Sequence, residues 1–169
     1  MEKVDTRWLT DAELSAWIRF IAVVELLPGV LDSQLRRDSD LTHFEYLVLA
    51  MLSEAPERTL RMTALAARTN STLARLSHVV SRLEARGLVE RSAYAEDRRA
   101  TNARLTADGW STIVAAAPGH VETVRRNVID ALTPEQVGQM REIADAVLGR
   151  IDSSGAMTEP YRRREAGEG

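Results

Sequence analysis

Cysteine is missing altogether from this chain of 169 residues. Its absence excludes disulfide bonds, thiolate catalysis, thiol-based redox sensing and cysteine-ligated zinc sites. The sequence also lacks any run of about 18 apolar residues, so we expect no membrane-spanning segment. Its N-terminus has no basic-then-apolar layout of the kind found in signal peptides, which favours a cytoplasmic protein.

Signals of catalysis and metal binding are equally scarce. The three histidines, His43, His78 and His120, lie far apart and form no H-x-x-x-H pair, so we expect no metal site. No glycine-rich phosphate loop or nucleophile elbow occurs. We therefore expect neither a cofactor nor an enzyme.

Charge is distributed unevenly along the chain. The net charge of −3 divides into −6 over residues 1–57, +6 over 58–104 and −3 over 105–169. Every basic residue of the middle segment is an arginine. A basic middle between acidic flanks suits a nucleic-acid-binding surface on a soluble body. A solvated charged face would give the same counts, so charge alone does not decide between the two.

Capping patterns predict a chain made mostly of helices. A Ser or Thr followed three residues later by Glu or Gln marks a helix start. Three such capping boxes occur: Thr10 with Glu13, Thr42 with Glu45, and Thr133 with Gln136. The pairs Pro28-Gly29 and Pro118-Gly119 interrupt two long helical patterns, and we expect a kink or a break at the first and a kink at the second.

The middle of the chain reads as a helix-turn-helix followed by a β-hairpin. A short helix over about 62–69 precedes a helix over 71–86, which Gly87 ends in a left-handed conformation. Strands are predicted over 88–91 and 100–105, with Thr106 capping a long helix to about residue 132. The inward face of the 71–86 helix is assigned to Leu73, Leu76, Val80 and Leu83. The fold class is mostly α with a small β-hairpin, that is, α+β.

The outward face of the 71–86 helix carries hydroxyls, an imidazole and two guanidinium groups: Thr72, Arg75, Ser77, His78, Ser81 and Arg82. Hydroxyls at a helix N-terminus suit phosphate oxygens, and arginine can bind the O6/N7 edge of guanine. A merely solvated face usually mixes both signs of charge. The helix-turn-helix context favours DNA recognition over that alternative.

The hairpin tip contains two adjacent arginines, Arg98 and Arg99, after Asp97. An arginine on a thin loop can enter the narrow minor groove, where the negative potential is strongest. Asp97 would be repelled by phosphate, so we expect it to turn back and shape the loop. Taken alone, the same residues are typical of an ordinary charged turn.

Together, these features resemble the winged helix-turn-helix core of the MarR (multiple antibiotic resistance regulator) family. The resemblance is carried by "SRLEARGLVER", the Asp97-x-Arg99 pair, Leu105-Thr106 and Gly109, and "LTPEQ" before the last helix also matches. It covers about residues 10–152. It implies an N-terminal dimerisation helix at 10–38, a DNA-binding domain at 41–106 and C-terminal dimerisation helices at 107–152. Residues 153–169 are expected to form a mobile tail.

The resemblance implies a homodimer that reads a pseudo-palindromic operator in double-stranded DNA and acts as a repressor. The recognition helix would enter the major groove through Ser71, Thr72, Arg75, Ser77, His78 and Arg82. Arg98 and Arg99 would reach the flanking minor groove, with Asp97 shaping the wing. The alternative is a winged-helix interaction protein, or an architectural DNA binder without a ligand response.

Many relatives of this family are released from DNA by small aromatic or lipophilic compounds. In this sequence, the pocket for such an effector could be lined by Trp17, Phe20, His43, Tyr46 and Trp110. Plain core packing is the alternative for each of these residues. Neither a membrane nor a cofactor is expected as a partner.

Overall fold

The computed structural model describes residues 6–94, 97–152 and 154–158, and the side chains of residues 94 and 97–100 are outside this description. Most of the expected tail at 153–169 therefore lies outside the described residues. Only residues 154–158 of that stretch are included, and they form turns after the last helix.

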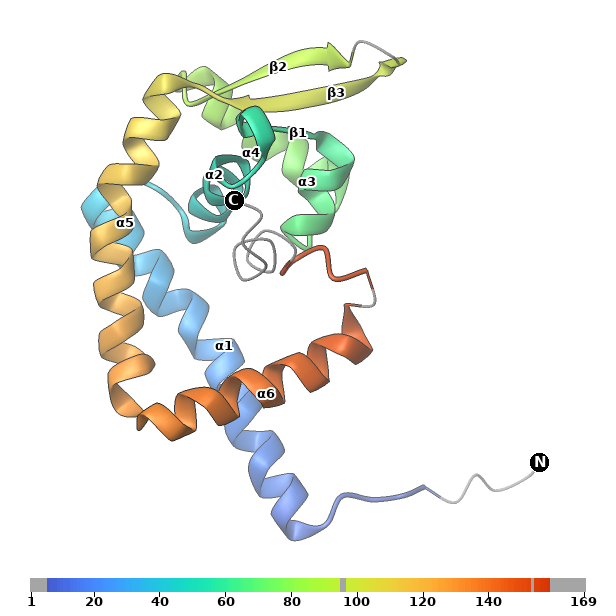
Figure 1. Cartoon of the computed structure of the whole chain (residues 1–169), viewed down its shortest axis with the longest axis vertical. Helices are drawn as coiled ribbons and strands as arrows, with labels where there is room; N and C mark the ends of the chain where they lie inside the picture. The colour runs from blue at the N-terminus through green and yellow to red at the C-terminus, as the bar shows by residue number, and fades with distance from the viewer. Residues whose placement is uncertain (1–5, 95–96, 153, 159–169) are drawn as a thin grey trace, which may run out of the picture.

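The chain folds into six α-helices, two short 3-10 turns and three strands within the described residues (Figure 1). The order is α1 (Asp11–Ser39), α2 (His43–Ser53), η1 (Pro56–Arg58), β1 (Thr59–Arg61), α3 (Met62–Arg68), α4 (Leu73–Ala85), β2 (Val89–Tyr94), β3 (Asp97–Leu105), α5 (Ala107–Asn127), η2 (Ile129–Ala131) and α6 (Pro134–Ile151). The expected α+β class, mostly helical with a small sheet, is confirmed.

All three capping boxes form as the sequence predicts. In each, the threonine hydroxyl accepts a hydrogen bond from the backbone N–H three residues on. The Glu or Gln at that position accepts one from the threonine N–H. These bonds satisfy donors that have no partner within the helix, so each helix starts at a fixed residue.

The two internal prolines do not break their helices. Helix α1 is continuous through Pro28, and α5 is continuous through Pro118. The expectation of a kink or a break at Pro28-Gly29 was therefore wrong as far as a break is concerned. Both prolines are exposed, so the carbonyl groups that lose their usual partner can be hydrated. Helix α5 ends at Asn127 rather than near residue 132, and η2 follows it.

The sheet has three antiparallel strands in the order β1-β3-β2, where the sequence indicated only a two-stranded hairpin. Strand β1 pairs Leu60 with Ala103, and β2 pairs Val89 with Leu105. Because β3 lies in the middle, its inward residues Ala103 and Leu105 are covered from both sides and are buried. The extra strand anchors the base of the hairpin to the segment just before α3.

The junction after α4 is tightly specified. Gly87 adopts φ +72°, and its N–H donates to the carbonyl of Glu84 while the N–H of Leu88 donates to that of Leu83, each at 2.9 Å. This pair of hydrogen bonds ends the helix at the position that Gly87 predicts from the sequence. The hydroxyl of Thr106, which caps α5, donates to the Gly87 carbonyl at 2.7 Å. The end of α4 and the start of α5 are thus joined directly.

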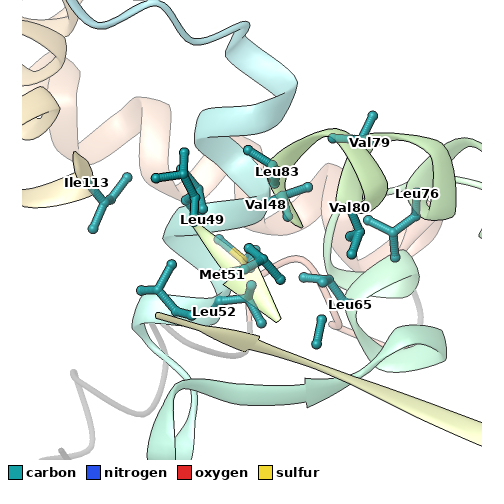
Figure 2. Packing of buried hydrophobic residues seen from close by; sticks show 14 of the residues in the cluster. Val48, Leu49, Met51, Leu52, Leu65, Leu76, Val79, Val80, Leu83 and Ile113 are labelled. Carbon is teal, nitrogen blue, oxygen red and sulfur yellow. The ribbon is translucent and has the colours of Figure 1, made fainter. Parts of the chain in front are cut away.

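The hydrophobic core lies between α2, α3, α4 and the inner face of the sheet. Figure 2 shows Leu49 and Leu52 of α2 close to Ile113 of α5, and Leu76 and Val80 of α4 beside Leu65 of α3. The fully buried side chains are Leu35, Leu41, Val48, Leu49, Met51, Leu52, Leu65, Leu76, Val80, Leu83 and Val89. This core belongs to the winged part of the chain, with α1 and α5 each contributing residues from one end.

The outer helices leave apolar surface exposed. Residues 134–151 of α6, all of them described, include no buried residue. In α1 only Leu31, Gln34 and Leu35 are buried. The exposed large apolar side chains on α1, α5 and α6 are Leu14, Trp17, Ile18, Phe20, Val23, Val24, Leu26, Val30, Trp110, Val114, Val121, Met140, Ile143, Val147 and Ile151.

Helix α1 is long and apolar enough, by length and composition alone, to cross a membrane, which differs from the expectation that no segment is. Arg19 and Glu25 interrupt its apolar stretch, but an 18-residue part of the helix still has a high mean hydropathy. The core helix of a soluble protein meets the same criterion. Since Leu31 is buried and Leu35 packs into the core, α1 is part of the folded body over its last third.

Candidate nucleic-acid interface

Helices α3 and α4 are joined by a short turn that fixes their relative direction. Asn70 takes a left-handed conformation with φ +45°, and the Thr69 hydroxyl donates to the Leu65 carbonyl at 2.8 Å. The Ser71 hydroxyl lies 3.0 Å from that of Thr69. Thr72 then caps α4 by accepting from the N–H of Arg75 at 3.2 Å. Thr72 is therefore the N-cap of α4.

Helix α4 has a buried row and an outward row. The buried residues are Leu76, Val79, Val80 and Leu83. Since a helix advances about 100° per residue, His78 and Ser81 point away from that row, and His78 is exposed. Leu73 was expected to face inward, but it is 49% exposed. As the first residue of the helix, it sits on the rim of a hollow instead of inside the core.

That hollow has a volume of about 280 Å³ and lies between α3, α4 and the sheet. It is lined by Arg61, Met62, Thr63, Leu73, Ser77, Arg91 and Thr101. Ser77 from the expected set therefore faces this hollow, on the opposite flank of α4 from its arginines.

Both arginines of the expected set lean toward α2. The guanidinium carbon of Arg75 lies 4.3 Å from the centroid of the Phe44 ring, a cation–π arrangement. One guanidinium nitrogen of Arg82 lies 3.1 Å from Oε1 of Glu45, whose side chain is only 7% exposed. Arg75 and Arg82 are seven residues apart and so project along one side of the helix.

The acid on α4, Glu84, is neutralised from the other side. Arg91 of β2 donates to Oε2 of Glu84 at 2.7 Å and to the Ser81 hydroxyl at 3.1 Å. The Arg91 side chain holds the pKa of Glu84 below its usual value. Glu84 therefore stays ionised but its charge is balanced, so the outward face of α4 carries no uncompensated negative charge.

The wing residues Asp97, Arg98 and Arg99 belong to β3 by their backbone, but their side chains lie outside the described residues. The backbone alone places them at the far end of the hairpin from α5 (Figure 1). Their expected roles stay predictions from the sequence.

The first pair of the five expected effector-lining residues lies on the first half of α1. Trp17 and Phe20 are close together there, with ring centroids 6.4 Å apart, and both are about half exposed. Trp110 at the start of α5 lies instead beneath Arg58, whose guanidinium carbon is 3.8 Å from the ring centroid.

The remaining pair, His43 and Tyr46, meets His120 of α5. The His120 ring centroid is 4.3 Å from that of Tyr46 and 6.5 Å from that of His43. The five residues thus fall into three groups within one chain. His120 is far from His43 and Tyr46 in the sequence, so spacing along the chain could not reveal that its imidazole ring lies beside theirs.

This junction of α1, α2 and α5 contains two unsatisfied polar atoms. Nδ1 of His120 and Oε1 of Gln34 are buried without a hydrogen-bond partner in the described part of the chain. Burial lowers the pKa of His120, and the neighbouring His43 lowers it further. Burial also lowers the pKa of His43, while Asp32 acts in the opposite direction. Among the described residues, no group of three acidic or histidine side chains is placed to hold a metal ion.

Three residues that sequence reasoning did not assign to the site take part in its structure. Glu45 was recognised only as a cap, yet it also pairs with Arg82. Arg91 ties the hairpin to α4, and Phe44 carries the Arg75 guanidinium. These contacts join separate elements, so no local pattern signals them.

A short helix, a turn, a second helix with a polar outward face and an antiparallel hairpin define a winged helix-turn-helix protein. A family model described as the MarR family matches residues 39–100. The solved structure of Sco3205, a MarR family transcriptional regulator from Streptomyces coelicolor in complex with DNA, is 43% identical, with a TM-score of 0.81. The match covers 86% of this chain and 91% of Sco3205.

AbsC, another MarR family transcriptional regulator from Streptomyces coelicolor, is 37% identical with a TM-score of 0.82, over 88% of this chain and 99% of AbsC. The chain therefore belongs to the MarR family. Its relatives are transcriptional regulators and not enzymes. The transcriptional regulator HosA from Escherichia coli O127:H6 is 37% identical over 47% of this chain. The match spans only a little over half of HosA, 57%.

Proposed function

We propose that this protein is a sequence-specific regulator of transcription that binds double-stranded DNA as a homodimer. The single observation that carries the proposal is the outward face of α4. Its acid, Glu84, is neutralised by Arg91, which leaves hydroxyls, His78 and a surrounding excess of arginine to meet DNA. A polyanion would be attracted to such a face, whereas uncompensated acids would repel it.

In this proposal α4 enters the major groove. His78, the outward residue, would contact a base edge, with Arg75 and Ser77 on its two flanks. Ser71 and Thr72 at the helix N-terminus would contact phosphate oxygens. Arg98 and Arg99 at the hairpin tip would reach the minor groove, as the resemblance implies, while Asp97 shapes the wing.

The exposed apolar surface on the outer helices supports the homodimer. Helix α6 follows the end of α5 that lies far from the sheet (Figure 1), and Ile143 and Ile151 on it are 61% and 76% exposed. Apolar faces of this extent are usually covered by a partner. A second copy, bringing its own α1, α5 and α6, would cover the exposed apolar surface of these helices in both subunits. The dimer would then bring two winged domains to the two halves of an operator.

The proposed regulator acts in the cytoplasm as a repressor, because a dimer seated on an operator excludes other proteins from the same DNA. A small aromatic or lipophilic effector would release it. The unsatisfied Gln34 Oε1 and His120 Nδ1 support an effector with a polar group at the junction of α1, α2 and α5. His43 and Tyr46 would flank that group.

DNA binding is tested by titrating the protein against DNA from upstream of its own gene at salt concentrations of about 50–200 mM. Contacts to several phosphates predict a steep loss of affinity with salt. A footprint with two half-sites about one helical turn apart would support the dimeric arrangement. Failure to bind any DNA, or an affinity indifferent to salt, would favour a winged-helix interaction protein.

Effector release is tested on the same complex by adding a panel of small aromatic acids and neutral aromatic compounds. Release by a compound that loses its effect in a His120→Gln variant would support the junction as its binding site. If the compound releases the His120→Gln variant from DNA as readily as the unaltered protein, the effector binds elsewhere.

A further inference from the structure

We propose that Glu45 and Arg82 are positioning residues that hold the recognition helix α4 at its working angle. This inference rests on the proposed DNA-binding function. It assigns the Arg82 guanidinium to a contact within the protein and not to a base or phosphate. The key observation is the 3.1 Å contact between a guanidinium nitrogen of Arg82 and Oε1 of Glu45.

The Glu45 carboxylate joins two elements at once. Its Oε2 accepts a hydrogen bond from the Thr42 N–H at 2.8 Å, which closes the capping box of α2. Its Oε1 faces Arg82 of α4. Glu45 is 95% buried, with a relative exposure of 5%. It therefore has no access to DNA, so any influence on DNA binding has to pass through α4.

An unpaired carboxylate at this depth would be unfavourable, because burial removes its hydration. Arg82 is the cation that compensates it, and at 48% side-chain exposure Arg82 keeps part of its own hydration. The favourable geometry is therefore one in which α4 presents Arg82 to Glu45. A rotation of α4 about its axis would separate the two charges.

Two further contacts lie along the same side of α4. Arg75 stacks on Phe44, and Arg86 lies 3.6 Å from Asp40, the left-handed residue that ends α1. With Arg82 between them, three arginines spaced seven and four residues apart contact the α1–α2 corner. We infer that this corner sets the rotation of α4, with Glu45 as the buried central contact.

The variant Glu45→Gln tests this role with little change in shape. A glutamine can close a capping box in this chain, because Gln136 does so with Thr133. Glu45→Gln therefore keeps the cap of α2 and removes only the charge that faces Arg82. Glu13→Gln is the matched control, since Glu13 closes the equivalent box with Thr10 at the exposed start of α1.

Operator affinity gives opposite results for the two roles of Arg82. If Arg82 is a positioning residue, Glu45→Gln lowers affinity on the order of tenfold, as coupled residues of one network do. The slope of affinity against salt stays unchanged, because no phosphate contact is lost. If Arg82 contacts DNA, Glu45→Gln frees it, and affinity stays the same or rises. The latter result would overturn the proposal.

Hydrogen exchange of the free protein tests the positioning role without DNA. Glu45→Gln should speed amide exchange in α4, and Glu13→Gln should leave α4 unchanged. Unchanged exchange in α4 of Glu45→Gln would overturn the positioning role. Absence of DNA binding by the unaltered protein would instead overturn the proposed function, so the two failures are distinguishable.

Discussion

The imidazole ring of His120 on α5 lies against the phenol ring of Tyr46 on α2, with their centroids 4.3 Å apart. His43 flanks the same imidazole, and Asp32 of α1 accepts a hydrogen bond from the His43 backbone N–H at 2.8 Å. This junction connects the helices proposed for dimerisation with the winged core. It also contains both histidines whose pKa is lowered by burial.

Stability should therefore rise with pH across the titration range of histidine. A folded-state pKa below the unfolded value of about 6.5 means that the unfolded chain binds more protons in this range. The resulting loss of stability appears as the pH falls below about 6.5. We expect the midpoint of urea unfolding to increase from pH 5 to pH 7.

The variant His120→Gln should flatten that increase, because it removes one of the two imidazole rings whose pKa is lowered by burial. His78→Gln is the control, since His78 is exposed. An equally steep increase in His120→Gln would show that other groups produce the pH dependence.

Replacing His78 with alanine should change which base is preferred at one position of each half-site. His78 is the outward residue of α4, and losing one base contact costs about 1–3 kcal/mol in discrimination. Affinities for an operator panel with single-base changes would measure this. A uniform loss over all sequences would assign His78 to the DNA backbone.

Replacing Arg99 with alanine should weaken DNA binding without unfolding the protein. If the guanidinium neutralises one phosphate, the slope of log affinity against log salt should fall by about 0.9. The exposed Arg141 on α6 offers a control, because Arg141→Ala removes the same charge far from the wing. Equal effects from both variants would mean that only net charge matters.

Gly109→Ala should destabilise the protein by about 2–3 kcal/mol, as overpacking does. A Cβ atom at this position would lie 2.1 Å from the Leu88 carbonyl oxygen, which belongs to the backbone and cannot move aside easily. Gly138→Ala in α6 is the control, because a Cβ there meets nothing within 4 Å. It should raise helix stability by about 0.5–1 kcal/mol. Thermal unfolding of both variants would measure the difference.

Ile143→Glu should shift the protein from dimer toward monomer. Ile143 lies on α6 with 61% of its surface exposed in the single chain, and a buried unpaired charge at an interface is strongly unfavourable. Gln139→Glu adds the same charge to the same helix at a polar position. Sedimentation at several concentrations should show dissociation for Ile143→Glu alone. An unaffected dimer would exclude this part of α6 from the interface.

The sequence predicted the parts of the fold that local chemistry controls. The capping threonines fixed three helix starts, and Gly87 marked the end of α4. Strand β1 was missed because its three residues, Thr59–Arg61, are too few for an alternating pattern to emerge. Its existence depends on pairing with β3, about forty residues later.

The site was predictable in outline but not in its contacts. The polar outward face of α4 followed from helical spacing, whereas the pairing of Arg82 with Glu45 depends on how α2 packs across α4. Leu73 was assigned to the core because spacing alone cannot tell that the first residue of a helix lies at the rim. Long-range packing, invisible to local patterns, decided each of these points.

The hydrogen bond from the Thr106 hydroxyl to the Gly87 carbonyl fixes the end of α4 to the start of α5, so the two helices move together at this junction. Helix α5 has 21 residues and is therefore about 30 Å long. A small tilt of α5 at its distant end, where α6 follows, would therefore change the angle between α5 and the C-terminal end of α4. In the proposed homodimer, subunit contacts at the far end of α5 would therefore change the angle of α4, the helix proposed to enter the major groove.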